Sequence, residues 1–292
     1  MKVVSYNIQF ARGLDFKIDL DRVCDAIADA DLVCLQEVDQ FWQRSGNVDQ
    51  FAEIQRRLPQ FYSVFGSSFN LDASFRDGDG TIVNRRRRQG NMILSRWPII
   101  STRCFNLPKI DSDQRFNMQM LFVESVVAVG DYCFRLYNYH GGYLASEERL
   151  AQVDYFASVF ERSPGEGGAW SGKADIDGDD WSNASQPPLL PHSAIVCGDF
   201  NAPPASAEYR RLLDKTGLID CWALADRHNI DASSLRKEVS ADIDISGKVD
   251  HILLSADMVD FLSGVGIDQR AEGSDHKPVW AELDLPPGQS GA

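Results

Sequence analysis

Short apolar runs alternate along the chain with longer amphipathic segments, and this alternation predicts a layered domain of the α/β or α+β class. Strands are expected where an apolar run stands between polar residues, at 3–9, 31–37, 91–95, 99–105, 118–129, 132–140, 194–197, 249–255 and 278–284. Helices are expected where apolar residues recur every three or four positions, at 19–29, 49–58, 146–162 and 206–216. The chain shows no internal repeat.

Two polar segments interrupt this pattern. Residues 72–89 contain glycines and four consecutive arginines at 85–88, and we expect a loop there. The arginines are either a solvated charge run or a contact for phosphate or nucleic acid. Residues 163–191 are rich in Gly, Asp, Ser and Pro, which indicates an insertion loop that either acts as a lid or covers a surface. We expect one domain over 1–285 and a flexible tail at 286–292.

The composition is that of a globular protein, with 292 residues, 43% hydrophobic and 25% charged. It excludes collagen, a coiled coil and a disordered chain. The 43 acidic and 29 basic residues leave a net charge of −14. Proteins that bind nucleic acid mainly by neutralising phosphates are usually basic. If this chain acts on a phosphate compound, a local device such as a metal ion or a confined basic patch must bind it.

The chain carries no recognisable export or membrane signal. Its first residues lack the apolar run of a signal peptide, and residues 118–129 are too short and too polar to span a bilayer. The six cysteines form no CxxC pair, and most stand among apolar neighbours. Buried, reduced thiols are expected, and with them a cytoplasmic protein without stable membrane insertion.

Several predicted strands end on, or begin with, polar residues suited to chemistry. They are Asn7, Glu37, His140, Asp199, Asn201, Asp250, Asp275 and His276. Ligands gather in layered proteins where strand ends and their loops converge, so these side chains are expected to share one site. Their oxygen atoms suit a hard cation such as Mg²⁺ or Mn²⁺, and two histidines without cysteine disfavour structural zinc. Such a cation would let an acidic protein bind phosphate.

Five motifs resemble those of the metal-dependent endonuclease/exonuclease/phosphatase superfamily, which has the DNase I-like fold. They are SYNI at 5–8, LQEV at 35–38, GNMILS at 90–95, GDFN at 198–201 and SDH at 274–276. The last two, with VDHI at 249–252, are the most specific. The resemblance covers nearly the whole chain. It implies a four-layer αββα sandwich of two packed mixed β-sheets, with the active site at one sheet edge.

The resemblance also implies a metal centre and a base. Glu37 would be the principal ligand of Mg²⁺ or Mn²⁺, helped by Asn7 and Asp275. Asp199 would orient or deprotonate the attacking water. Asn201 would hold phosphate or metal.

The remaining implied roles lie on the phosphate side of the site. His276 would stabilise the transition state or act as an acid/base, with Asp250 hydrogen-bonded behind it. A carboxylate in that position fixes the tautomer of the imidazole and favours its protonated form. His140 would be a second phosphate-facing imidazole. Asn91 and Arg115 match positions at which relatives bind the substrate phosphate.

The predicted function is hydrolysis of a phosphodiester, or of a phosphomonoester, by in-line attack of water with Mg²⁺ or Mn²⁺ bound. The substrate stays open among nucleic acid, a phospholipid headgroup and a small phosphate ester. A different class of function is a binding protein that keeps the fold without turnover, but none of the implied catalytic residues is missing. A monomer is expected.

Overall fold

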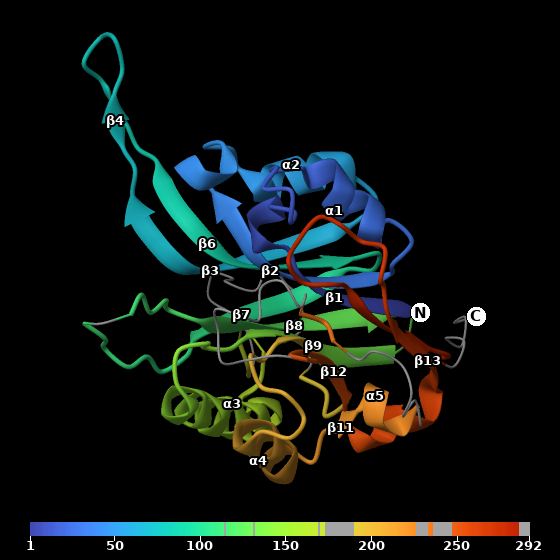
Figure 1. Ribbon diagram of the computed structural model, residues 1–292. Coiled ribbons are helices and arrows are strands. Elements are labelled where there is room, and N and C mark those ends of the chain that lie inside the picture. The colour runs from blue at the N-terminus through green and yellow to red at the C-terminus, as the bar shows by residue number, and fades with distance from the viewer. Residues whose placement is uncertain are drawn as a thin grey trace.

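The computed structural model describes residues 1–113, 115–130, 132–168, 170–172, 190–225, 233–235 and 247–285. Two six-stranded β-sheets pack face to face, and helices cover the outer face of each sheet (Figure 1). This is the predicted four-layer αββα sandwich. Most of the predicted insertion loop and the whole predicted tail lie outside the described residues.

The first sheet has the strand order β13-β14-β1-β2-β6-β3, in which only β1 and β2 are parallel neighbours. Its strands are β1 (Lys2–Asn7), β2 (Leu32–Gln40), β3 (Tyr62–Asp72), β6 (Arg86–Ser95), β13 (Leu262–Ile267) and β14 (Val279–Leu283). Helices α1 (Leu20–Ile27) and α2 (Gln50–Arg57) cover its outer face. Their N-caps are the side chains of Asp19 and Asp49, which accept main-chain hydrogen bonds of the first turn. The short 3-10 helices η1 (Gln9–Ala11) and η2 (Gln43–Ser45) follow β1 and β2.

The second sheet has the order β11-β12-β10-β9-β8-β7, in which only β9 and β10 are parallel neighbours. Its strands are β7 (Ile99–Asn106), β8 (Leu121–Val129), β9 (Tyr132–His140), β10 (Ala194–Asp199), β11 (Ile219–Asp220) and β12 (Asp250–Leu254). Helices α3 (Ser146–Glu166) and α4 (Ala207–Thr216) pack on its outer face. The short helices α5 (Cys221–Leu224) and η3 (Ala256–Phe261) follow β11 and β12. No described helix is both long enough and apolar enough to cross a bilayer.

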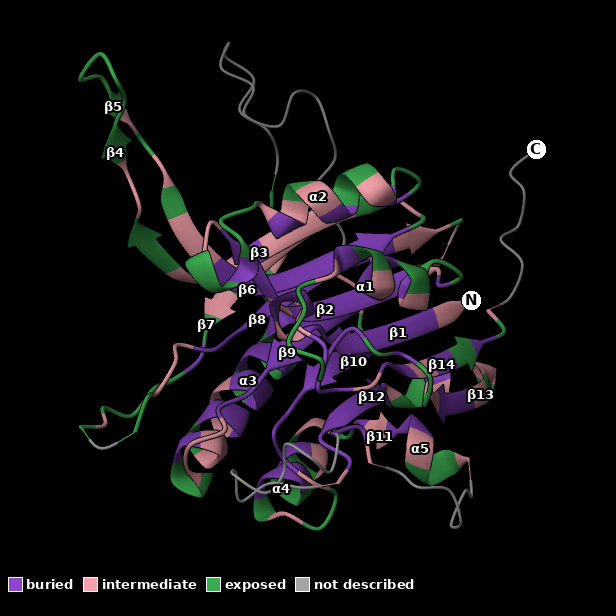
Figure 2. Ribbon diagram, turned by 45° about the horizontal axis from the view of Figure 1, so that its top comes forward, coloured by how far each residue is buried: buried purple, intermediate pink, exposed green. Residues whose placement is uncertain are grey.

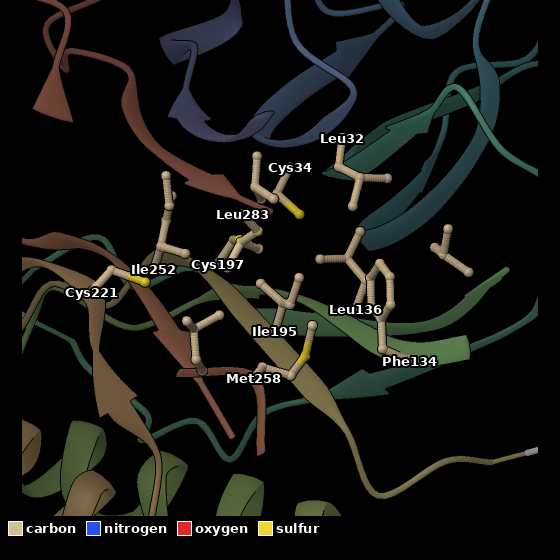
Figure 3. Packing of buried hydrophobic residues seen from close by; sticks show 14 of the residues in the cluster. Leu32, Cys34, Phe134, Leu136, Ile195, Cys197, Cys221, Ile252, Met258 and Leu283 are labelled. Atoms are coloured by element: carbon tan, nitrogen blue, oxygen red, sulfur yellow. The ribbon is translucent and has the colours of Figure 1, made fainter. Parts of the chain in front are cut away.

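The main core lies between the two sheets. Alternate residues of each strand point into it, so that Leu32 and Cys34 of β2 face Leu136 and Cys197 of the second sheet (Figure 3). The intervening residues of β2 point outward and pack beneath α1 and α2. The central strands of both sheets are almost entirely buried, and they are purple in Figure 2. All six cysteines are free thiols, and four of them are buried.

The prediction of a loop over 72–89 is wrong for much of this segment. β3 and β6 continue as a paired ribbon in which residues 70–72 face residues 86–88, and β4 (Phe75–Arg76) pairs with β5 (Ile82–Val83) near its end. We call residues 68–88 the arm; it projects from the sandwich in both views (Figures 1 and 2). Strand periodicity is hidden here because consecutive arginines place the same polar side chain on both faces of the ribbon.

Strands β3, β11 and β13 were not predicted from the sequence. Of these, β13 contains two glycines. Its glycines weaken the strand signal, yet they have a packing role, because a Cβ at Gly266 would lie 2.4 Å from the Trp280 ring of the neighbouring strand. Helix α3 continues four residues beyond its predicted end and contains Pro164.

Gly198→Ala is expected to cost about 3 kcal/mol or more of the free energy of unfolding. A Cβ at this position would lie 1.9 Å from the carbonyl oxygen of Tyr139, so β9 and β10 would have to separate. Gly217→Ala is the control, because Gly217 ends α4 with φ +67 and has no atom within 4 Å of its added Cβ. That change should cost only about 1 kcal/mol. Urea unfolding of the two variants measures the difference, and equal losses would contradict this packing argument.

Candidate active site

The predicted site residues gather where the central strands of both sheets end. Asn7 is the last residue of β1, His140 ends β9 and Asp199 ends β10. His140 and Asp199 are direct neighbours in the parallel β9–β10 pair. β1 and β10 contact each other across the core, so the two strand ends meet.

A bulge in β2 directs Glu37 toward this meeting point. The β2–β6 register shifts between Leu35 and Val38, and Glu37 has the left-handed backbone angle φ 59°. Such a conformation is strained for a residue with a Cβ and is concentrated at functional sites. The Glu37 side chain keeps 17% of its surface exposed, whereas the strand around it is buried.

Asn7 joins the first sheet to the second. Its Nδ2 donates to Glu37 Oε1 at 3.1 Å and to Asp199 Oδ2 at 3.0 Å. The main-chain N–H of Gln9 donates to Asn7 Oδ1 at 3.0 Å, which fixes the orientation of the amide. The two carboxylates are therefore held a few ångströms apart on one amide group.

Asp275 lies near enough to Glu37 for its charge to act on that carboxyl group. Its Oδ2 accepts a hydrogen bond from Gln9 Nε2 at 2.5 Å, and Ser274 Oγ donates to the Asn7 carbonyl at 2.7 Å. Burial, followed by the charge of Asp275, raises the pKa of Glu37 to about 7. Two carboxylates that repel each other form a donor pair that fits a hard divalent cation.

His276 is held by a buried carboxylate. Its Nδ1 lies 2.8 Å from Asp250 Oδ2, and Asp250 has no exposed surface. Burial alone would lower the pKa of His276, but the charges of Asp250 and Asp199 outweigh it and hold this pKa well above its usual value. His276 is therefore protonated at neutral pH, with Nε2 3.7 Å from Asp199 Oδ2. Donor atoms of Asp199, Asp250 and His276 also lie within 4.8 Å of one another, a spacing that a metal ion could use.

His140 has the opposite protonation state. Its Nε2 lies 3.9 Å from Glu37 Oε1 and 3.8 Å from Asp199 Oδ2. Burial, with a smaller effect of the His276 charge, lowers the pKa of His140 to about 4. One site thus contains a neutral and a protonated imidazole.

Asp199 and Asn201 form the turn that ends β10. Asp199 Oδ1 accepts from the main-chain N–H of Asn201 at 2.9 Å, and Asn201 Nδ2 donates to the Gly141 carbonyl at 3.0 Å. Asn201 has φ 48°, which asparagine tolerates better than most residues. Burial raises the pKa of Asp199 to about 7; Asp250 adds to this rise, and His276 and Asn7 oppose it.

Among the described residues, Asn91 and Arg115 form no hydrogen bond or ion pair with these side chains. Asn91 is fully buried between the sheets and donates from Nδ2 to the Asn138 carbonyl at 3.0 Å. Arg115 is exposed in the segment between β7 and β8, and its charge acts on the nearby hydroxyl of Tyr143. Phosphate binding by Asn91 or Arg115 stays a prediction.

Three supporting residues were not predicted from the sequence. Gln9 orients Asn7 and Asp275, as described above. Gln36 Nε2 donates to Asn138 Oδ1 at 2.8 Å across the sheet interface, and Asn138 Nδ2 donates to carbonyls of β2 and β6. Gln36 and Asn138 could have been identified from the sequence, because each is a polar residue within an otherwise apolar strand. Gln36 stands one residue before Glu37, and Asn138 stands two residues before His140.

Known proteins share this architecture. The sequence model of the endonuclease/exonuclease/phosphatase family matches residues 4–276. No curated protein matches the chain. Among solved structures, an endonuclease/exonuclease/phosphatase from Bacteroides vulgatus is 19% identical, with a TM-score of 0.66 and 98% of each chain covered.

Two further structures have more specific names. A 3′-5′ exonuclease from Neisseria meningitidis is 20% identical, with a TM-score of 0.58, over 98% of this chain and 100% of that chain. A mannosyl-6-phosphatase from Bacteroides thetaiotaomicron is 17% identical, with a TM-score of 0.61, over the same shares. These distant likenesses show the fold, and the sequence match shows the family. The chain belongs to the endonuclease/exonuclease/phosphatase family.

Proposed function

We propose that this protein is a hydrolase of phosphate esters that depends on Mg²⁺ or Mn²⁺ and cleaves a phosphodiester by in-line attack of water. One observation carries the proposal: a carboxyl group with a pKa near 7, Asp199, and a protonated imidazole, His276, adjoin the carboxylates Glu37 and Asp275. Asp199 supplies a base for the attacking water, His276 supplies a positive charge for the phosphate, and Glu37 and Asp275 supply a metal site. Phosphoryl transfer to water needs all three.

Glu37, Asp275 and Asn7 would hold the metal. When bound, the metal supplies positive charge that neutralises phosphate oxygens and the leaving oxygen. The trio of Asp199, Asp250 and His276 is the weaker candidate, because His276 Nδ1 is already hydrogen-bonded to Asp250 and the raised pKa of His276 favours a proton over a metal.

The other side chains act on water and phosphate. Asp199, once ionised, accepts a proton from water as the new oxygen–phosphorus bond forms. The leaving oxygen departs on the opposite side of phosphorus. His276 presents a proton on Nε2 to a phosphate oxygen, and Asp250 holds that imidazole in place. His140 adds a neutral hydrogen-bond donor, and the Asn201 turn keeps Asp199 oriented.

The named relatives act on different esters. One is called an exonuclease, a related Neisseria structure is described as a 3′ phosphatase bound to product DNA hairpin, and a third is called a mannosyl-6-phosphatase. We therefore keep a phosphomonoester as the second candidate substrate. Hydrolysis of bis-p-nitrophenyl phosphate and of p-nitrophenyl phosphate, with Mn²⁺, with Mg²⁺ and with EDTA, separates the two. Turnover of the diester only with metal supports the proposal, whereas metal-dependent turnover of the monoester alone would replace it with a phosphatase.

Metal binding is expected to stabilise the protein more at pH 8 than at pH 5.5. In the metal-free protein, the pKa values of Glu37 and Asp199 are about 7, above their ordinary values of 4.5 and 3.8. The folded state therefore loses stability as pH rises from about 4 to about 7. A divalent cation needs Glu37 ionised, and its binding offsets this loss. The rise in Tm caused by about 5 mM Mg²⁺, relative to NaCl of equal ionic strength, measures the effect; an equal rise at both pH values would count against the site.

A further inference from the structure

Arginine side chains and aromatic rings alternate along the base of the arm. The guanidinium of Arg44 lies 4.6 Å from the Trp42 ring, and that of Arg87 lies 5.4 Å from the same ring. Arg85 lies 4.9 Å from the Phe41 ring and 4.7 Å from the Phe75 ring. The two stacks adjoin, because Arg87 Nε donates to the Phe41 carbonyl at 3.2 Å. We call this set the ladder: Arg44, Trp42, Arg87, Phe41, Arg85 and Phe75.

The ladder begins beside the candidate active site. Val38, the residue after Glu37, pairs with Gly90 of β6, and Trp42 Nε1 donates to the Arg88 carbonyl at 2.7 Å. From Gly90 the chain runs five residues outward to Arg85, about 17 Å at the rise of a strand. At the spacing of stacked bases this distance corresponds to about five nucleotides. The ladder therefore leads from the neighbourhood of Glu37 along β6 toward the arm, which projects from the sandwich in Figure 1.

The positive charge of the arm is poorly compensated. Within the described part of the chain, Arg85, Arg87 and Arg88 form no ion pair with a carboxylate, and the nearest pair on this ribbon joins Arg86 to Asp72 at 3.6 Å. Arg88 Nε is buried without a hydrogen-bond partner among those residues. The protein as a whole has 14 more acidic than basic residues, so the absence of ion pairs at these arginines does not reflect a shortage of carboxylates in the chain. Neighbouring guanidinium groups repel one another, and an anion along the ladder would relieve that repulsion.

We propose that the ladder is a binding track for single-stranded nucleic acid. The guanidinium groups of Arg85 and Arg87 pair with phosphates, whereas that of Arg44 is already paired with Asp39 at 2.9 Å and serves as a stacking surface. Bases stack on the rings and on the planar guanidinium faces. Stacking of this kind requires unpaired bases, which favours a single strand over a duplex. A lipid surface is the weaker partner, because the tip of the arm carries Asp77 and Asp79 beside the exposed Phe75 and Ile82. Binding of a strand to the ladder does not depend on the proposed function. Only the inference that the bound strand is cleaved at the candidate metal site rests on it.

The test measures binding without turnover. Fluorescence anisotropy in EDTA compares a labelled thymidine 12-mer with a thymidine dinucleotide, for the wild type and for Arg85→Gln/Arg87→Gln. The control Arg56→Gln/Arg210→Gln removes two exposed positive charges from α2 and α4. We expect the wild type to bind the 12-mer at least about tenfold more tightly than the dinucleotide. The ladder variant should lose this preference for the 12-mer. The slope of log affinity against log salt concentration should also become smaller by about 1.4, because each of the two lost phosphate contacts on a single strand contributes about 0.7.

The remaining outcomes decide between partners. Hydrolysis of bis-p-nitrophenyl phosphate should be equal in the wild type, the ladder variant and the control. Equal binding of both oligomers, or an equal loss of affinity in the control, would overturn the track. The track would also be overturned if the ladder variant lost binding to anionic phosphatidylserine vesicles but bound the 12-mer as tightly as the wild type does. Binding of the 12-mer without any metal-dependent turnover would retain the track and reject the hydrolase, whereas turnover without such binding would do the reverse.

Discussion

Asp199→Asn is expected to lower kcat for bis-p-nitrophenyl phosphate by about 10²–10⁴-fold, because the amide cannot accept the proton of the attacking water. The protein should nevertheless remain folded. Burial raises the pKa of Asp199 to about 7, so the ionised carboxylate costs folding free energy at pH 8, and a neutral amide does not. An asparagine keeps only one of the two hydrogen bonds that Asp199 accepts from Asn7 and Asn201, and this loss offsets the gain. We therefore expect Tm at pH 8 to stay close to that of the wild type.

The pH dependence of the wild type checks the same assignment. Asp199 must be ionised to act as a base, so kcat should fall by about tenfold for each pH unit below about 7. Steady-state kinetics and thermal unfolding of the purified variant are the measurements. Activity within threefold of the wild type, or a rate that does not change between pH 5 and pH 8, would remove Asp199 from the role of base.

His276→Ala is expected to reduce both catalysis and stability. Loss of a donor to the phosphate oxygen should lower kcat by about 10²–10³-fold. The change also leaves Asp250 buried without its 2.8 Å partner, at a cost of about 3–5 kcal/mol in the free energy of unfolding. The pKa of folded His276 is raised, so its contribution to stability is complete below pH 6.5 and is lost as pH rises through the folded-state pKa. The loss should accordingly be larger at pH 6 than at pH 9.

A double-mutant cycle isolates the pair. Removing Asp250 as well, in His276→Ala/Asp250→Ala, should recover part of the lost stability, because no buried charge is then left unpaired. Recovery of stability without recovery of kcat is the expected combination. Losses that simply add in the double variant would mean that the two side chains do not interact in solution.

The strands and helices of the sandwich core were predictable because burial leaves a periodic pattern. β9 has the predicted bounds, and α1, α2 and α4 lie within the predicted helices. The pattern did not reveal the arm, where side chains contact each other and solvent instead of a core. It also missed β13, whose glycines make room for the Trp280 ring, a constraint that appears only when the strands are paired.

The composition of the site was predictable in the same way, because polar residues at the ends of apolar strands are conspicuous. Asn7, Glu37, Asp199 and His276 do come together. The protonated form of His276 was expected from the carboxylate behind it. The lowered pKa of His140 and the raised pKa values of Glu37 and Asp199 were not predictable, because burial causes them. His140 and His276 have pKa values shifted in opposite directions, since only His276 faces a buried carboxylate at hydrogen-bond distance. The bulge that turns Glu37 into the site likewise depends on the register of β2 against β6.

The most direct test of the metal centre compares the wild type with Glu37→Gln across a Mn²⁺ titration, with the rate of bis-p-nitrophenyl phosphate hydrolysis as readout. Glutamine preserves the size of the side chain and its contact with Asn7, and removes only the charge that the bulge of β2 directs into the site. We predict a saturable, Mn²⁺-dependent rate in the wild type and a rate at least about 100-fold lower in the variant at every Mn²⁺ concentration. Equal Mn²⁺-dependent rates in the two proteins would contradict a metal centre built on Glu37.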